Sequence, residues 1–191
     1  MNVETLHDLF LFEIQGLYAV ETRVADELAT LERDAGVDAL DGLQETDARE
    51  TLREVLAEHE TETRTHAERL EEVLEVLGRT PDSRSTRNSQ SAPALEGLVE
   101  EKERFNNVVL NDQIRPLFYV GTARQIEQME ITAYERLLEI GDHLDVPDEV
   151  IDSLERNLEE DEATLRTLES ITDGEDGQVL LEELGDSADH D

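Results

Sequence analysis

The sequence contains no cysteine, which excludes disulfide bonds, cysteine-ligated zinc and iron–sulfur clusters. No apolar run approaches the ~18 residues that a membrane-spanning helix needs, and the first residues show neither a basic region nor a cleavage site for secretion. A glycine-rich phosphate loop is also missing, as is a Ser/His/Asp or Cys/His grouping for nucleophilic catalysis. We therefore expect a soluble, cytoplasmic protein that has no membrane partner.

Positive charge is scarce. The 191 residues include 50 acidic and 16 basic side chains, a net charge of −34, and Lys102 is the only lysine. So negative a chain repels nucleic acid, so we expect no nucleic-acid partner. An acidic, lysine-poor sequence with regular apolar spacing indicates a protein that folds in concentrated salt, where screening weakens self-repulsion. We hypothesise a halophilic source, a haloarchaeon.

Apolar residues recur every three or four positions over most of the chain, which is the spacing of amphipathic helices rather than of strands. Two long helices are predicted first, at about 5–34 and 47–77. Gly36 and the Gly42 region interrupt the pattern between them, and Gly78 ends the second. The short connection predicts that these two helices pack antiparallel.

A different kind of segment follows. Residues 79–93 are rich in Ser, Thr, Asn and Pro, which predicts an exposed linker. A short helix is expected at about 94–106. Two long helices follow, one at about 116–143 and one after Pro147 that continues to about 171. Residues 174–191 predict a short C-terminal helix, near 178–184, and a frayed acidic tail. Two hairpins joined by a long crossover indicate an all-α fold, a ferritin-like antiparallel four-helix bundle over residues 1–173.

Acidic side chains interrupt the apolar stripe of every long helix. Each residue turns a helix by roughly 100°, so the angle of each side chain follows from its number. Most of these acids lie inside the stripes, with Glu62 at a margin and His59 within the stripe of the same helix. Five acids also lie within about one turn of mid-height on their helices, namely Glu21, Glu62, Glu127, Glu130 and Asp161. His66 and Glu13 lie farther from that level and are less well placed.

Five carboxylates at one level of a dry core repel one another unless they are protonated or bound to cations. A pair of divalent ions would remove that cost. Carboxylates with one or two imidazoles suit iron or manganese, and acids at i and i+3 point the same way. Any single acid could instead be a solvated boundary residue, because the chain holds 50 of them. Convergence on four helices favours a site for two ions.

The sequence also resembles the ferritin-like family typified by the bacterial YciE and YciF proteins, over about residues 6–171. The matching stretches, short but spread over every expected helix, are Asp8-Leu9-Phe10, Leu17-Tyr18-Ala19-Val20-Glu21, His59, Glu62-Thr63, Glu68-Arg69-Leu70, residues 94–101, Ile126-Glu127-Gln128-Met129-Glu130-Ile131, Ala133-Tyr134 and Leu158-Glu159-Glu160-Asp161.

The resemblance implies a bundle that is frequently dimeric, with a metal site and a role in stress. It places ligands at Glu21, Glu62, Glu127, Glu130, Glu160 and Asp161. Two positions depart from the family pattern. Gln128 stands where a histidine is common, and Asp161 stands where a glutamate is usual.

Two functions remain open. The first is a metal-binding protein with two iron or manganese ions, acting in oxidative or general stress. In it Glu62 and Glu130 bridge or chelate, and His59 is a ligand or holds one in place. The terminal ligands are Glu21, Glu127 and Asp161. The second is a non-catalytic helical homodimer, an interaction or stress-protective protein with a vestigial site. A carboxylate-rich, histidine-poor site gives little support for oxidase chemistry, so whether the protein is an enzyme stays open.

Overall fold

The computed structural model describes residues 2–36, 47–81 and 92–174, together with residues 178, 181, 182 and 185. Over this part of the chain the secondary structure is helical and contains no strand, which confirms the all-α prediction. The elements are α1 (Leu6–Gly36), α2 (Asp47–Val76), α3 (Pro93–Val108), a 3₁₀ turn η2 (Asp112–Ile114), α4 (Arg115–Gly141) and α5 (Asp148–Asp173).

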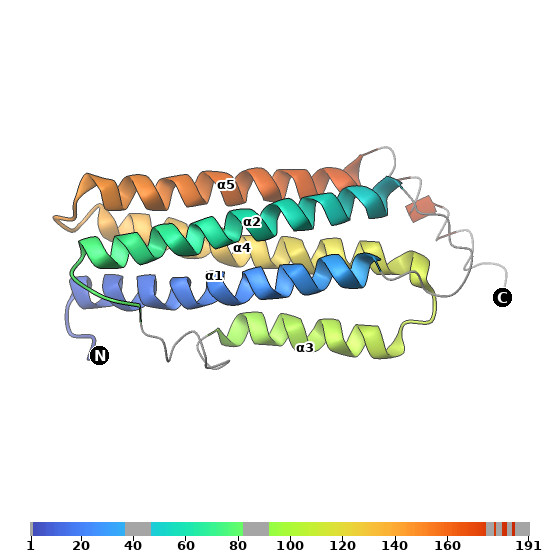
Figure 1. Ribbon diagram of the computed structural model, residues 1–191, viewed down its shortest axis with the longest axis horizontal. Helices are drawn as coiled ribbons and strands as arrows, with labels where there is room; N and C mark the ends of the chain where they lie inside the picture. Colours follow the sequence, from blue (N-terminus) through green and yellow to red (C-terminus); the bar gives the residue numbers. More distant parts are fainter. Residues whose placement is uncertain are drawn as a thin grey trace.

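The four long helices, α1, α2, α4 and α5, lie side by side along the long dimension of the molecule (Figure 1). α1 packs against α2 and α4, and α5 packs against the same two helices. α3 lies outside this group, against α1 and α4, so it connects the two hairpins along one flank (Figure 1). Each long helix therefore turns one face toward a shared interior.

Local sequence explains where α2 ends. Gly78 has a φ of +69°, a left-handed conformation that costs a residue with a side chain about 1–2 kcal/mol. The amide of Gly78 donates to the Glu75 carbonyl at 2.9 Å, and the amide of Arg79 donates to the Leu74 carbonyl at 2.8 Å. This pattern satisfies the last free carbonyls of the helix. The predicted stop at Gly78 is confirmed.

Two apolar clusters fill opposite ends of the interior. The first is built around Val24, Leu28, Leu31, Leu52, Leu56, Tyr119, Val120, Ala123, Ile126 and Leu168. The second is built around Phe10, Ile14, Leu17, Leu70, Val73, Leu74, Tyr134, Leu137, Val150 and Leu154. On every long helix the stretch between the two clusters carries polar side chains at buried positions. We call this stretch the polar layer.

The only lysine of the chain fastens α3 to α1. Lys102 is 1% exposed, and its Nζ lies 2.5 Å from Glu27 Oε1 on α1. The carboxylates of Glu103 and Asp34 follow at 3.2 and 3.6 Å. A buried ammonium needs such partners, because an isolated charge in the interior is very costly.

Part of the predicted linker and tail lies outside the described residues. Residues 82–91 of the linker and 186–191 of the tail belong there, whereas Pro93 is the first residue of α3 rather than the last of the linker. Within the predicted C-terminal helix, Gln178, Leu181 and Glu182 are helical. None of the described helices combines the length and the apolar character that crossing a lipid bilayer demands.

Candidate metal centre

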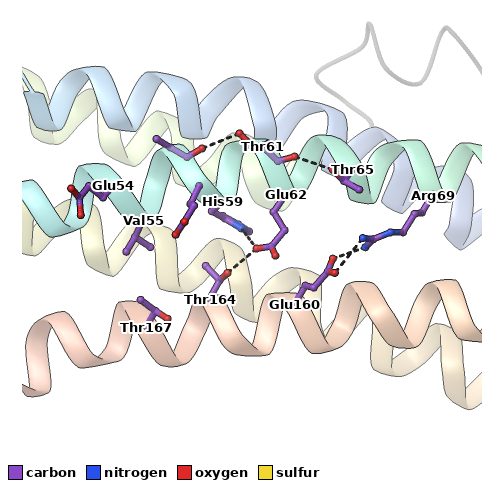
Figure 2. Close-up of a pocket in the computed structure, with 12 residues that line it drawn as sticks. Glu54, Val55, His59, Thr61, Glu62, Thr65, Arg69, Glu160, Thr164 and Thr167 are labelled. Atoms are coloured by element: carbon purple, nitrogen blue, oxygen red, sulfur yellow. Dashed lines mark hydrogen bonds and ion pairs between the residues drawn. The ribbon is translucent and has the colours of Figure 1, made fainter.

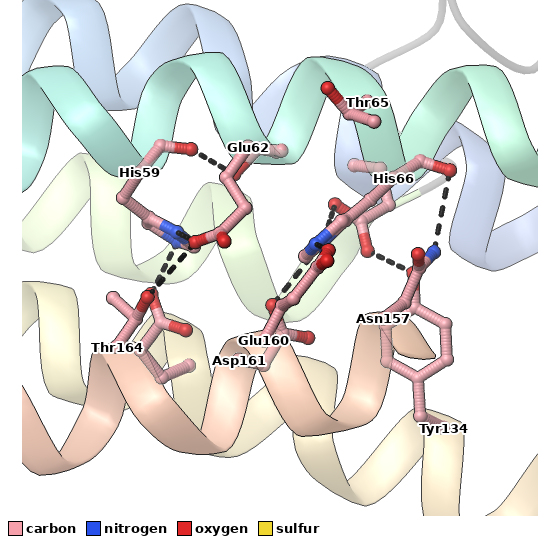
Figure 3. Close-up of polar contacts among 12 residues, drawn as sticks. His59, Glu62, Thr65, His66, Tyr134, Asn157, Glu160, Asp161 and Thr164 are labelled. Atoms are coloured by element: carbon pink, nitrogen blue, oxygen red, sulfur yellow. Dashed lines mark hydrogen bonds and ion pairs between the residues drawn. The ribbon is translucent and has the colours of Figure 1, made fainter. Parts of the chain in front are cut away.

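Six titratable side chains meet in the polar layer. They come from all four long helices, and each is 2% exposed or less: Glu21 of α1, His59 and His66 of α2, Glu127 and Glu130 of α4, and Asp161 of α5. In Figure 3 the side chains of His59 and His66 point from α2 toward α5, where Asp161 lies beside His66. We call these six residues the central cluster.

Helical periodicity places the imidazoles of α2. The buried positions of this helix include Leu52, Leu56, His59, Thr63, His66, Leu70 and Leu74, which follow one another in steps of three and four. Two histidines and a threonine thus take mid-helix places where an ordinary core helix carries aliphatic side chains. Burial of two imidazoles is favourable only if they find partners on the facing helices.

Asp161 belongs to two groups of three residues that could each hold one ion. One group is His59, Glu127 and Asp161, and the other is Glu21, His66 and Asp161. Within each group one ligand atom per residue lies within 4.8 Å of the others. His59 Nε2 is 2.5 Å from Glu127 Oε1, and His66 Nδ1 is 3.3 Å from Asp161 Oδ1. Two adjacent ion positions with one shared carboxylate fit this geometry.

Most ligand atoms of the central cluster make no hydrogen bond. Ten buried side-chain nitrogen and oxygen atoms lack a well-oriented partner, among them both carboxylate oxygens of Glu127, Glu130 and Asp161. In the part of the chain that the structure describes, every such atom belongs to one of these six residues. An unsatisfied buried polar atom costs roughly 1–3 kcal/mol. Because so many of these atoms lie in one place, they indicate a binding partner that is absent from the protein alone. Bound cations are such a partner.

Charge coupling raises the basicity of both imidazoles. Burial alone lowers the pKa of His59, but Glu127, Glu62 and Asp161 together more than offset it and the pKa rises to about 10. Burial likewise opposes the charge of His66, yet Asp161 and Glu21 raise its pKa to about 10. Without a metal, both imidazoles therefore carry a proton at neutral pH. Metal binding has to displace those protons.

Three carboxyl groups of the central cluster are shifted toward the neutral form, those of Glu127, Glu130 and Asp161. Burial raises the pKa of Glu130 well above its ordinary value, and the charges of Glu21, Asp161 and Glu127 raise it further. Burial raises the pKa of Asp161 to about 7, with His66 opposing the rise. Groups with strongly displaced pKa values that share one buried volume are typical of functional sites.

A hydrogen-bond chain orients Glu21 from behind. The Tyr134 hydroxyl donates to Glu21 Oε1, and Asn157 Nδ2 donates to the Tyr134 Oη at 2.8 Å. Arg69 Nη1 in turn donates to Asn157 Oδ1 at 2.6 Å. All but Arg69 are fully buried. The chain leaves Glu21 Oε2 free to face His66, 3.8 Å from Nδ1.

The remaining two predicted ligands, Glu62 and Glu160, lie at the rim rather than in the central cluster. Glu160 approaches His66 from the outside, with Oε2 3.0 Å from Nε2 (Figure 3), and forms an ion pair with Arg69. A carboxylate behind a histidine fixes the ring and its tautomer, so that the other nitrogen faces a metal. Glu62 is 35% exposed and lies 3.8 Å from His59 Nδ1.

His66 belongs to the central cluster although its sequence position, a turn away from mid-height on α2, predicts a weaker place for it. The signal was its spacing of seven from His59, which returns a helix to the same face. Glu13, the other side chain set aside, forms an ion pair with Arg136 at 2.6 Å and takes no part in the cluster.

Comparisons with known proteins agree with this fold. Protein YciF of Escherichia coli (strain K12) is 25% identical to this chain over 164 residues, which cover 86% of this chain and 88% of YciF. YcfI from Rhodopseudomonas palustris superposes with a TM-score of 0.73 at 24% identity, over 88% of this chain and 96% of YcfI. The crystal structure of the E. coli stress protein YciF superposes with a TM-score of 0.70 at 23% identity, over 91% and 100%.

The sequence profile described as "Domain of unknown function (DUF892)" matches residues 5–180, almost the whole of the described structure. The chain therefore belongs to the DUF892 family.

Proposed function

We propose that this protein binds two iron or manganese ions in the central cluster. The observation that carries the proposal is the pair of ligand groups that share Asp161, with the unsatisfied buried atoms of the described structure gathered on the same six residues. Carboxylates and imidazoles are the ligands that these two metals prefer in proteins. The arrangement of two hairpins joined by a crossover supports assigning residues 1–173 to a ferritin-like bundle, a fold that builds such sites between its helices.

Each of the two ions would have its own set of ligands. His59 and Glu127 would hold one ion, Glu21 and His66 the other, and Asp161 would bridge them. Both oxygens of Glu130 are buried without partners, so this carboxylate is available as a further ligand once it loses its proton. Bound iron or manganese would supply redox chemistry toward oxygen or peroxide. The protein would exclude water and fix the ligands, and a stress-linked role rests on the name of the E. coli relative.

The direct test is metal reconstitution. Purified protein, stripped with chelator and then dialysed against Mn²⁺ or anaerobic Fe²⁺, is expected to retain two ions per chain by elemental analysis. Binding should release protons, since both imidazoles are protonated in the metal-free form. The titration should therefore show buffer-dependent heats. Fewer than about 0.2 ions per chain with either metal would refute the site, on the stoichiometry that its two ligand groups imply.

A metal-independent role is the second candidate, and one observation favours it. The pairs His59–Glu127 and His66–Asp161 can each share a proton, which lets the core balance part of its charge without a metal. The protein would then be a helical homodimer that acts in interaction or stress protection, with a vestigial site. It predicts that metals have no effect on stability.

Replacing Glu130 by leucine separates the two candidates. In metal-free protein at pH 7 the variant should gain roughly 1–3 kcal/mol of unfolding free energy, because it removes two unsatisfied buried oxygens. The folded pKa of Glu130 is raised, so its ionisation destabilises the fold above its unfolded pKa and not below it. The gain should thus shrink as the pH falls toward about 4, because Glu130 is then neutral in both states and only its unsatisfied buried oxygens still cost stability.

With saturating Mn²⁺ the same substitution should reverse sign and lower the melting temperature, because a ligand is lost. Glu135→Leu is the control, since Glu135 is exposed on the same helix and should stay within about 0.5 kcal/mol. If Glu130→Leu remains more stable than the unsubstituted protein in Mn²⁺, the interpretation as a vestigial site is supported.

A further inference from the structure

An open groove runs between α2 and α5 on the outside of the central cluster (Figure 2). Its volume is about 840 Å³, and its lining includes Glu54, Glu58, Glu62, Glu160 and Thr164. The acids at 54, 58 and 62 stand four residues apart, so they form one row along α2. Besides His59, the described lining holds one basic residue, Arg69, which is already paired with Glu160. Such a groove concentrates cations.

His59 connects the groove to the central cluster. The residue is 2% exposed, yet it contributes to the groove lining. Its Nε2 lies 2.5 Å from Glu127 Oε1 in the interior and its Nδ1 lies 3.8 Å from Glu62 Oε2, and neither nitrogen has a well-oriented hydrogen-bond partner. The ring therefore separates an outer carboxylate from an inner one, with an unsatisfied nitrogen on the outer side.

Glu62 is placed at this boundary by a contact across the groove. Its Oε2 accepts a hydrogen bond of 3.2 Å from Thr164 Oγ1 on α5 (Figure 2). The side chain remains 35% exposed and is a member of neither three-residue ligand group. Glu62 can therefore meet a solvated ion without any movement of the helices.

We propose that the groove between α2 and α5 is the entry route for divalent cations, and that Glu62 is a transfer ligand rather than a resident one. This inference rests on the proposed metal site. The acidic row attracts the hydrated ion, and Glu62 replaces part of its water shell. The ion then passes His59 to reach Glu127 and Asp161.

A transfer ligand and a resident ligand have different kinetic signatures. A group that binds the ion only on the way in and out changes the association and dissociation rates together and leaves affinity unchanged. A resident ligand changes affinity, mostly through dissociation. A carboxylate that merely orients His59 would also change affinity, by about 10–100-fold.

The experiment is stopped-flow loading of metal-free protein with Co²⁺, followed by its visible absorption, for the unsubstituted chain and for Glu62→Gln. We expect association to slow by about tenfold or more, release to slow in proportion, and the dissociation constant to change by less than about threefold. Glu68→Gln removes the same charge from an exposed site of α2 outside the groove lining, and its rates should stay within about twofold.

The proposal is overturned if Glu62→Gln weakens equilibrium affinity tenfold while association is unchanged, which would make Glu62 a ligand or an orienting group. It is equally overturned if neither rate changes. If the unsubstituted protein binds no Co²⁺ at all, the metal site itself fails, and the entry route fails with it.

Discussion

Replacing Asp161 by asparagine should abolish tight binding at both ion positions together. Asp161 is a member of both ligand groups and is fully buried, so no exposed acid can take its place. Asparagine keeps the shape but removes the charge and one metal-binding oxygen. We expect affinity for both ions to fall at least about 100-fold, beyond the usual cost of losing an outer partner. Calorimetric titration with Mn²⁺ measures it.

Variants of residues that belong to only one ligand group are the comparison for Asp161→Asn. Glu127→Gln should weaken mainly the ion held with His59, and Glu21→Gln mainly the ion held with His66. Glu159→Gln, an exposed acid two residues before Asp161, should leave both unchanged. If Asp161→Asn loses only one ion while the other binds normally, the carboxylate is not shared and the two-position geometry is wrong.

Replacing Lys102 by methionine should lower the free energy of unfolding by about 3 kcal/mol, the low end for breaking a buried ion pair. Met matches the aliphatic stem but leaves Glu27, which is 5% exposed, without its 2.5 Å partner. Arg23 Nη1, at 3.6 Å from Glu27, offers partial compensation. Urea unfolding with an unchanged m-value would measure the loss.

Two further variants serve as controls for Lys102→Met. Arg104→Met removes the same charge from an exposed position on α3 and should change stability by less than about 0.5 kcal/mol. The double variant Lys102→Met, Glu27→Leu should regain most of the loss, because no uncompensated charge stays buried. A single variant as stable as the parent would show that the ion pair contributes nothing to holding α3.

The helices were predictable because apolar spacing and end signals act locally. Gly78 stops α2 through its own backbone conformation, and Pro147 precedes α5, so both boundaries could be predicted from the sequence. The meeting of Glu21, Glu127 and Asp161 was predictable for a related reason. In a set of parallel and antiparallel helices of similar length, sequence number converts directly into height.

The sequence does not predict whether a side chain at the edge of an apolar helix stripe points into the core or toward solvent. Glu62 and Thr63 are neighbours on α2, yet Thr63 is fully buried while Glu62 faces the groove. Which of the two turns inward depends on how α2 is rotated against α5. That rotation is set by packing, through pairs such as Glu62 with Thr164.

Lys102 was beyond sequence reasoning for another reason. Its three acidic partners include two on α1, some 70 positions earlier in the chain, and nothing in the local pattern of α3 indicates that it docks there.

The burial of Lys102 has a practical consequence for chemical labelling. Reagents that acylate amines need an exposed, unprotonated nitrogen, and this side chain offers neither. Burial opposes its charge, but Glu27 and its other acidic partners raise the pKa of Lys102 above the ordinary value. Because the chain has no second lysine, modification at this position reports one event, the lifting of α3 from α1. The rate of lysine acylation would then time that local opening directly.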